Sequence, residues 1–285
     1  MRDPLFELDW SGGAAEHHHR KACPGIEELP WGTIDVGLYP SALVDAARRA
    51  WTEVTIAEYR AYVAFARVLE AMALARVPLD LLGMGAAFVA DEAAHVELAG
   101  RMCMELGGAA PLTVNMDTFA RFPIAEGLSH LQRASDWVVR VSCVSEAFSA
   151  ATAVGSLRAA SHPLSRAVHE RILADESRHT RLGPLFLDWL SDRIDDAERA
   201  RLADVALDTL GHLKPFWQRR ISKTTAGVTE EGWKVDDIHA LGWLESEKMV
   251  PLARQVVTKD IVPTLAGYGI APDALALDAL LAQSP

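Results

Sequence analysis

The sequence predicts an all-α protein whose centre is a four-helix bundle with one long crossover connection. Long segments repeat Ala, Leu, Arg and Glu at helical spacing, and Pro or paired Gly residues separate these segments. No part of the sequence carries a good run of alternating β-branched residues, which is the pattern of a strand. Two pairs of long helices joined by one longer connection are typical of such a bundle. At this point a generic helical bundle, in which helix length serves only stability, stays open as the alternative.

The first half of the chain divides into an arm and a pair of helices. Residues 1–40 are rich in Pro and Gly, so we expect an irregular N-terminal arm there. A first long helix is expected over 41–77, and Pro78 stops it. A second helix is expected over 79–106, and two successive glycines end it.

The second half begins with a looser stretch, 109–123, which is long enough to cross the end of the bundle. A third helix is expected over 125–160. After a break at Ser161, His162 and Pro163, a fourth helix is expected to run to about Leu190, followed by a fifth and several shorter helices. We therefore expect three parts, namely the N-terminal arm (1–40), the four-helix bundle (41–193) and additional C-terminal helices packed on that bundle (194–285).

Composition excludes several classes of protein. The chain has 28 Lys and Arg against 39 Asp and Glu, and a surface of that sign repels phosphate backbones, so we expect no nucleic-acid partner. Three widely spaced cysteines make neither a disulfide framework nor a cysteine-rich zinc site. The uncharged run 81–90 is about half the length of a membrane crossing, and the first residues lack a signal-peptide core. These features predict a soluble cytoplasmic protein without a membrane partner.

Two short motifs carry the candidate chemistry. Asp91-Glu92-Ala93-Ala94-His95 lies in the second expected helix and Asp175-Glu176-Ser177-Arg178-His179 in the fourth. Residues three apart in a helix point from the same face, so each Glu and His can reach a common point. The dipeptide Asp-Glu occurs only in these two places, and a His follows each Glu at the third position. A third Glu-x-x-His, at 16–19, falls in the arm, where we expect solvated, non-helical surface.

Charged side chains inside apolar helices are costly unless something compensates them. A pair of metal ions would do so, and carboxylate oxygens with one imidazole per ion suit iron or manganese. The two motifs alone leave two ions short of ligands, so the other two helices must supply acids.

In the third helix the only acid near mid-length is Glu146. Glu146 precedes the helix break at Ser161 by 15 residues and Glu176 follows it by 15, so antiparallel helices place both at one height. In the first helix Glu53, Glu58 and Glu70 compete. We choose Glu58, with Glu70 as the second choice, because Glu58 lies closest to the expected height and face. A capping box formed by Thr55 and Glu58 is the alternative explanation of that residue.

These residues resemble the ferritin-like dinuclear-iron superfamily, in its oxygenase or oxidase form. The superfamily pattern of Glu, Glu-x-x-His, Glu and Glu-x-x-His over four helices falls on Glu58, Glu92 and His95, Glu146, and Glu176 and His179. The second motif also matches the Asp-Glu-x-Arg-His of soluble diiron monooxygenases, whereas the first has Ala94 in place of Arg. The resemblance covers about 55–190.

The resemblance implies roles for these residues. Glu146 and one other Glu would bridge the ions, and each histidine would bind one ion. Asp91 and Asp175 would accept the remaining N–H of a histidine, paired across helices, and Arg178 would balance the excess negative charge.

A substrate pocket is expected beside the ligands. Small side chains around Glu146 would leave room and aromatic side chains would form walls, although ordinary core packing explains each of them as well. The candidates for this pocket are Tyr62, Phe65, Phe88, Ser142, Cys143, Ser149, Ala150 and His169. By resemblance to some N-oxygenating members, His169 is a further ligand, and the alternative is a partly exposed histidine.

The leading hypothesis is an oxygen-activating oxidoreductase with two iron ions (or iron and manganese), a small organic substrate and dioxygen. An electron-donor protein and a homodimer belong to the same expectation. The alternatives are a ferroxidase or iron-storage protein and a metal-free helical interaction module.

Overall fold

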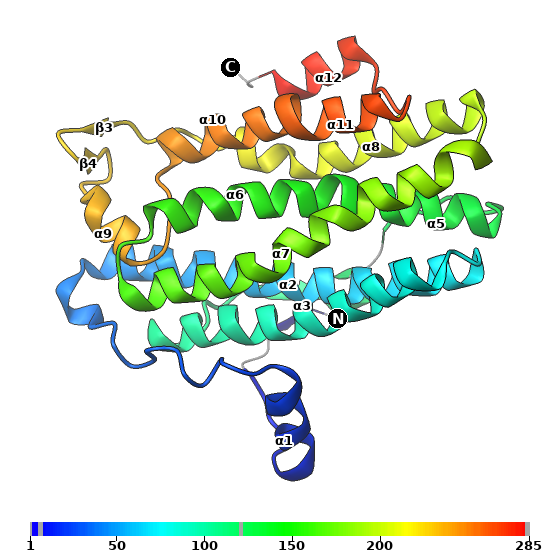
Figure 1. The fold of residues 1–285 in the computed structure, drawn as a ribbon. Coiled ribbons are helices and arrows are strands. Elements are labelled where there is room, and N and C mark those ends of the chain that lie inside the picture. The colour runs from blue at the N-terminus through cyan, green and yellow to red at the C-terminus, as the bar shows by residue number, and fades with distance from the viewer. Residues whose placement is uncertain (1, 5–7, 120–121, 283–285) are drawn as a thin grey trace.

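The computed structural model describes residues 2–4, 8–119 and 122–282, and it confirms the all-α class (Figure 1). The described part contains strands only as two short antiparallel pairs. Strand β1 (Arg2–Pro4) pairs with β2 (Thr113–Asn115), and β3 (Thr224–Thr225) pairs with β4 (Val228–Thr229).

Four long helical segments form the bundle, in the expected order. They are α2 (Ser41–Leu74), α3 (Leu79–Glu105), a third segment built from α5 (His130–Val138), η2 (Val139–Ser145) and α6 (Glu146–Ala159), and α7 (Pro163–Leu190). The crossover between α3 and α5 carries β2 and the short α4 (Met116–Phe119).

The helix ends differ from expectation by a few residues, for local reasons. The first helix stops at Leu74 because Arg76 adopts a φ of 56°, before Pro78 is reached. The third segment starts at His130 because Ser129 and Gln132 form a capping box at its N-terminus.

The third segment is not one regular α-helix. Its middle part, η2, is a π-helix that ends immediately before Glu146, and the hydroxyl of Ser145 donates to the carbonyl of Arg140 at 2.8 Å. A π-helical turn rotates the residues that follow it relative to a regular helix, and such turns are frequent at functional sites.

The arm is more ordered than expected. Residues Gly13–Ala22 form helix α1, which includes the Glu-x-x-His at 16–19, so the expectation of a non-helical stretch is wrong there, although no residue of α1 is buried (Figure 1). The reason is a long-range contact that the local sequence does not show. His19 Nε2 lies 2.8 Å from an oxygen of the buried Glu97 of α3, and Arg20 pairs with the same carboxylate.

The C-terminal residues add a layer of helices over the third segment (Figure 1). This layer contains α8 (Asp196–Trp217), which follows a short η3 (Ser191–Arg193), and then α10 (Ser246–Val256), η4 (Val257–Ile261), α11 (Val262–Gly267) and α12 (Ala274–Leu281). The short α9 (Val235–Ala240) packs instead at the end of the bundle beside Trp51 and Ser165. A 3-10 turn η1 (Val36–Leu38) lies in the arm. Gly155 allows α10 to pack on α6, because a Cβ there would lie 2.5 Å from a methyl carbon of Leu252.

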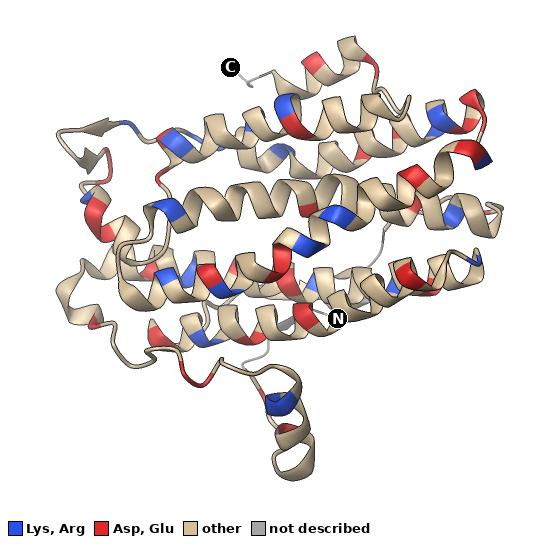
Figure 2. Cartoon of the chain, in the orientation of Figure 1, with Lys and Arg blue, Asp and Glu red and all other residues tan. Residues whose placement is uncertain are grey.

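Helix α6 carries only two charged residues, Glu146 and Arg158, near its ends (Figure 2). Among the described residues the helical run His130–Ala159 is the one stretch long and apolar enough to cross a membrane by length and composition. In the structure this run lies within the bundle and between the layers, 56% buried over the tested window, as a core helix does.

The apolar interior consists of two clusters. One contains Phe65, Phe88 and Leu182, and the other contains Trp51, Leu98 and Leu164. On α2, α3 and α7 alike, the residues of one cluster precede the middle of the helix and those of the other follow it. The residues between the clusters are buried acids and histidines, so a polar layer divides the core at the middle of the bundle.

Gly183 sets the closest approach of α7 to η2. A Cβ at this position would lie 2.7 Å from Cys143 Sγ and 3.3 Å from the Cys143 backbone nitrogen. We expect Gly183→Ala to lower the free energy of unfolding by about 1–3 kcal/mol, because the backbone of η2 leaves no room. Gly211→Ala in α8 is the control, since nothing lies within 4 Å of its Cβ, and a gain of up to ~1 kcal/mol is expected. Chemical denaturation measures both, and equal effects would contradict the close approach.

Candidate metal centre

The structure brings together the six side chains that the motifs singled out. Helix α2 supplies Glu58, α3 supplies Glu92 and His95, α6 supplies Glu146, and α7 supplies Glu176 and His179. All are buried except Glu58, whose side chain is 13% exposed.

Their donor atoms form two overlapping groups. In each group, one atom from each of four residues lies within 4.8 Å of the others. The groups are Glu58, Glu92, His95 and Glu176, and Glu92, Glu146, Glu176 and His179. Each group has one histidine, and the two groups share Glu92 and Glu176. Such a set of donor atoms could hold two metal ions.

Glu146 is expected from the resemblance to bridge both ions, whereas the donor atoms place it beside one histidine only. Glu146 belongs only to the group of His179, and its Oε2 lies 3.5 Å from His179 Nδ1. The carboxylates of Glu92 and Glu176 come from α3 and α7, the helices that carry the histidines, so they project between the two imidazoles.

In both histidines Nδ1 faces the carboxylates. His95 Nδ1 lies 3.4 Å from Glu176 Oε1, 3.6 Å from Glu92 Oε2 and 3.8 Å from Glu58 Oε2. His179 Nδ1 lies 3.1 Å from Glu92 Oε1 and 3.6 Å from Glu176 Oε2. Nδ1 is therefore the atom that each histidine offers to an ion.

The other imidazole nitrogen of each histidine faces an aspartate on the opposite helix. His179 Nε2 lies 3.2 Å from Asp91 Oδ2, and His95 Nε2 lies 3.5 Å from Asp175 Oδ2. This is the crossed pairing that the resemblance implied. An aspartate at Nε2 holds the proton there and leaves Nδ1 free as a ligand.

Two arginines hold these aspartates. Arg178 Nη2 lies 2.5 Å from Asp175 Oδ1 and 3.3 Å from Asp91 Oδ2, so one guanidinium connects both. Arg171 pairs with the other oxygen of Asp175. Sequence reasoning missed Arg171, although its position four residues before Asp175 on one helix was a usable signal.

Several buried ligand atoms have no hydrogen-bond partner. They are both carboxylate oxygens of Glu92, Oε2 of Glu146 and of Glu176, Nδ1 of His179, and both imidazole nitrogens of His95. Buried polar atoms are nearly always paired in folded proteins, and here the orphaned atoms face one another, except His95 Nε2, which lies 3.5 Å from Asp175 Oδ2. Cations at this point would satisfy them, so the donor set fits two metal ions.

The pKa values of the buried glutamates also fit a site for two metal ions. Burial, followed by the neighbouring charges of Glu146 and Glu92, raises the pKa of Glu176 to about 10. Burial and Glu92 raise the pKa of Glu58 to about 8. These carboxyl groups therefore hold protons at neutral pH when nothing else compensates them. Two divalent cations would replace the protons and balance the four carboxylates.

For His179, in contrast to Glu58 and Glu176, a raised pKa favours the charged form. Burial disfavours the imidazolium, but Asp91, Glu146 and Glu92 raise the pKa of His179 to about 12. Burial also works against ionisation of Asp175, yet His95 and Arg171 lower its pKa to about 2. Asp175 is thus an anion that can hold the His95 proton, and ion binding at either Nδ1 would release a proton.

The other acids of the first helix lie elsewhere. Glu70 is 58% exposed and pairs with Arg67 at 3.0 Å, and Glu53 is half exposed near Arg219. The capping-box alternative for Glu58 also fails, because Thr55 and Glu58 lie inside α2 and the hydroxyl of Thr55 donates to the carbonyl of Trp51.

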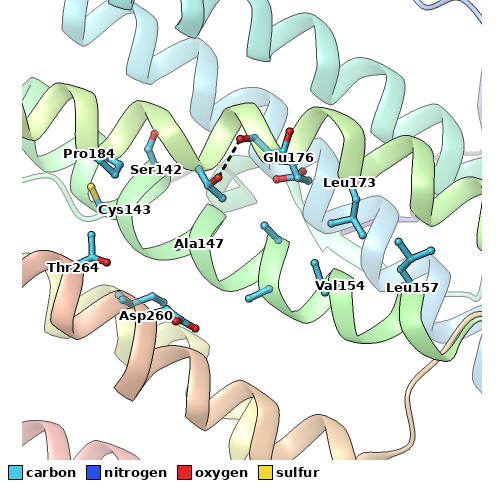
Figure 3. A pocket seen from close by; sticks show the side chains of 15 residues that line it. Ser142, Cys143, Ala147, Val154, Leu157, Leu173, Glu176, Pro184, Asp260 and Thr264 are labelled. Carbon is cyan, nitrogen blue, oxygen red and sulfur yellow. Dashed lines mark hydrogen bonds between the residues drawn. The ribbon is translucent and has the colours of Figure 1, made fainter.

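A cavity of about 560 Å³ adjoins the centre between α6 and α7, under η4 and α11 (Figure 3). Glu176 lines it, so one side chain belongs both to the metal groups and to the cavity wall. The lining residues are Ser142, Cys143, Ala147, Ala150, Ala151, Val154, Leu157, Leu173, Glu176, Ser177, Thr180, Pro184, Asp260, Ile261 and Thr264.

The expected pocket residues divide into three sets. Ser142, Cys143 and Ala150 line the cavity. Phe65 and Phe88 pack on the ring of His179, with centroids at 5.3 and 4.3 Å, and so enclose the metal groups instead.

The remaining candidates lie away from the cavity. Ser149 is exposed, and Tyr62 stacks on Tyr59. His169 is buried rather than partly exposed, because its Nε2 lies 2.9 Å from the carbonyl oxygen of Gly242 and its ring packs on Trp51. His169 also joins neither metal group.

Sequence reasoning did not find Asp260, Ile261 and Thr264, which cover the cavity from the C-terminal layer. They follow the bundle by more than 60 residues, and no motif marks them. Only the packing of α10 on α6 brings them there.

No protein family model matches the chain, and no curated protein matches its sequence. Among solved structures, the chain is similar to one described as protein 19 with aldehyde deformylating oxidase activity from Synechococcus. The TM-score is 0.48 and the identity 17%, over 84% of this chain and 96% of that chain.

Replacing either histidine should remove metal. We expect His95→Ala or His179→Ala to lose at least one of two bound ions, because each group of donor atoms has a single imidazole. Metal analysis of protein purified after growth with iron measures the effect. The exposed His130→Ala is the matched control, and an unchanged metal content in either histidine variant would remove that residue from the ligand set.

The first-helix ligand can be tested in the same way. Glu58→Ala should lower metal content or affinity, whereas Glu70→Ala should leave both unchanged because its carboxylate pairs with Arg67 at the surface. Titration of the metal-free proteins with ferrous ion under nitrogen compares the two. The reverse order would exchange their roles.

Proposed function

We propose that the protein is an oxygen-activating oxidoreductase that uses two iron ions, or iron and manganese, and acts on a small organic substrate. The observation that carries this proposal is the position of Glu176. Its carboxylate is common to both groups of donor atoms and also lines the adjoining cavity. A substrate in the cavity would therefore lie beside the ions.

One ion would bind to Glu58 and His95 and the other to Glu146 and His179, with Glu92 and Glu176 between them. Hard oxygen donors with one imidazole per ion favour iron or manganese over copper or zinc. Such a pair, when bound, would supply the binding and reduction of dioxygen.

The chain itself performs three tasks at this site. Asp91 and Asp175 hold the histidine protons at Nε2 and so orient both imidazoles. Arg178 and Arg171 balance the charge of these aspartates. Phe65 and Phe88 cover the ring of His179 and exclude water on that side.

The cavity supports a substrate-oxidising enzyme over a ferroxidase or storage protein. Oxidation of iron alone requires no mostly apolar cavity of this size next to a ligand, whereas sites for small organic molecules are of this kind. A metal-free interaction module is disfavoured because it would leave the orphaned carboxylates and imidazoles buried without compensation.

The proposal also covers the partners of the protein and its location. Reduction of dioxygen consumes electrons, so we include an electron-donor protein as a partner. A cytoplasmic location and a homodimer complete the proposal, with neither nucleic acid nor a membrane as a partner.

The test is metal content together with oxygen uptake. Protein grown with iron should bind about two ions per chain and consume dioxygen only with a reductant, whereas Glu176→Ala should lose most of this uptake because both groups of donor atoms lose a carboxylate. Glu70→Ala serves as the control. Iron held only as a mineral core would favour the storage protein, and absence of bound metal would favour the interaction module.

A further inference from the structure

The cavity beside Glu176 is elongated along two helices. Along α6 its lining runs from Ala147 to Leu157, and along α7 from Leu173 to Pro184. At 1.5 Å per residue each wall is about 15–17 Å long.

The two ends of the cavity differ in chemistry (Figure 3). Leu157 and Leu173 lie at one end, Ser142, Cys143 and Pro184 lie toward the other, and Glu176 lies between them. Alanines at 147, 150 and 151 form much of one wall, and small side chains on one helix face leave a groove for a ligand.

One polar group in the wall is unpaired. The side chain of Ser142 is buried, with the residue 1% exposed, and its hydroxyl has no hydrogen-bond partner within the described part of the chain. A buried hydroxyl in this condition is uncommon, and a ligand with an oxygen atom would satisfy it.

The charges of the lining exclude anionic ligands. No Lys, Arg or His lines the cavity, and its ionisable acids are Glu176 and the exposed Asp260. Burial raises the pKa of the Cys143 thiol to about 12, so this side chain is neutral. A carboxylate or phosphate in the cavity would therefore meet acids and no cationic side chain, and the charge of two divalent ions at the centre would already be balanced by the four carboxylates.

We propose that this cavity binds an uncharged, elongated aliphatic molecule with one hydroxyl or carbonyl group, which hydrogen-bonds to Ser142 while the chain runs past Glu176 toward Leu157 and Leu173. The inference deepens the proposed function, because it names the substrate class of the same site. Asp260 and Thr264 are exposed on the covering helices, so the molecule enters at that side.

The probe is decan-1-ol, and its binding to the iron-loaded protein without reductant is measured by calorimetry. We expect decan-1-ol to bind more tightly than butan-1-ol, because it covers more apolar surface. Decanoate, of equal length but charged, should bind at least tenfold more weakly than decan-1-ol. Equal binding of decanoate and decan-1-ol would overturn the inference.

Variants inside and outside the cavity test whether decan-1-ol binds there. Ala151→Phe fills the cavity, and Thr264→Trp narrows its exposed side without touching the core, so each should weaken decan-1-ol binding at least tenfold. Ser149→Phe, on the same helix but exposed and outside the cavity, should leave binding unchanged. Ser142→Ala should weaken decan-1-ol binding about fivefold, the effect of one lost neutral hydrogen bond.

The outcomes separate this inference from the proposed function. Protein that holds two ions and consumes dioxygen but binds no decan-1-ol, or whose cavity variants bind it normally, would overturn the inference alone. Protein that binds decan-1-ol in the cavity but holds no iron would leave the inference standing and overturn the proposed function.

Discussion

The mutual repulsion of buried carboxylates at the middle of the bundle is the constraint on which the rest of the structure depends. Glu92 and Glu176 face each other between two imidazoles, with Glu58 and Glu146 on either side, in a layer that apolar clusters close above and below. No hydrogen bond within the layer satisfies its orphaned atoms. The bundle is therefore organised around a layer of acids whose charge two cations could balance.

The residues around that layer hold its two histidines in place. The aspartates bind the outer nitrogens of the histidines across the gap between α3 and α7, and Arg178 connects both aspartates from the surface. Each support thus ties the two motif-bearing helices together. These contacts fix the direction of the imidazoles, which reduces the reorganisation that ion binding would need.

Much of this arrangement was predictable, because it depends on helical periodicity. Glu-x-x-His places two ligands on one face of one helix, and equal spacing from the turn at Ser161 places Glu146 level with Glu176. Contacts between distant segments were not predictable in this way. The helix in the arm depends on Glu97, the burial of His169 depends on Gly242, and the cavity cover depends on Asp260 and Thr264. Each is a contact between residues far apart in sequence, which no local pattern encodes.

The cover of the cavity comes from η4 and α11, and this segment gives no donor atom to either metal group. The inner walls of the cavity belong to the ligand-bearing helices, whereas its cover is separate from them along the sequence. Substitutions at Asp260 or Thr264 would therefore alter the entrance to the cavity while the ion-binding layer stays intact. Such a cover would offer evolution or engineering a route to new substrates that spares the donor residues.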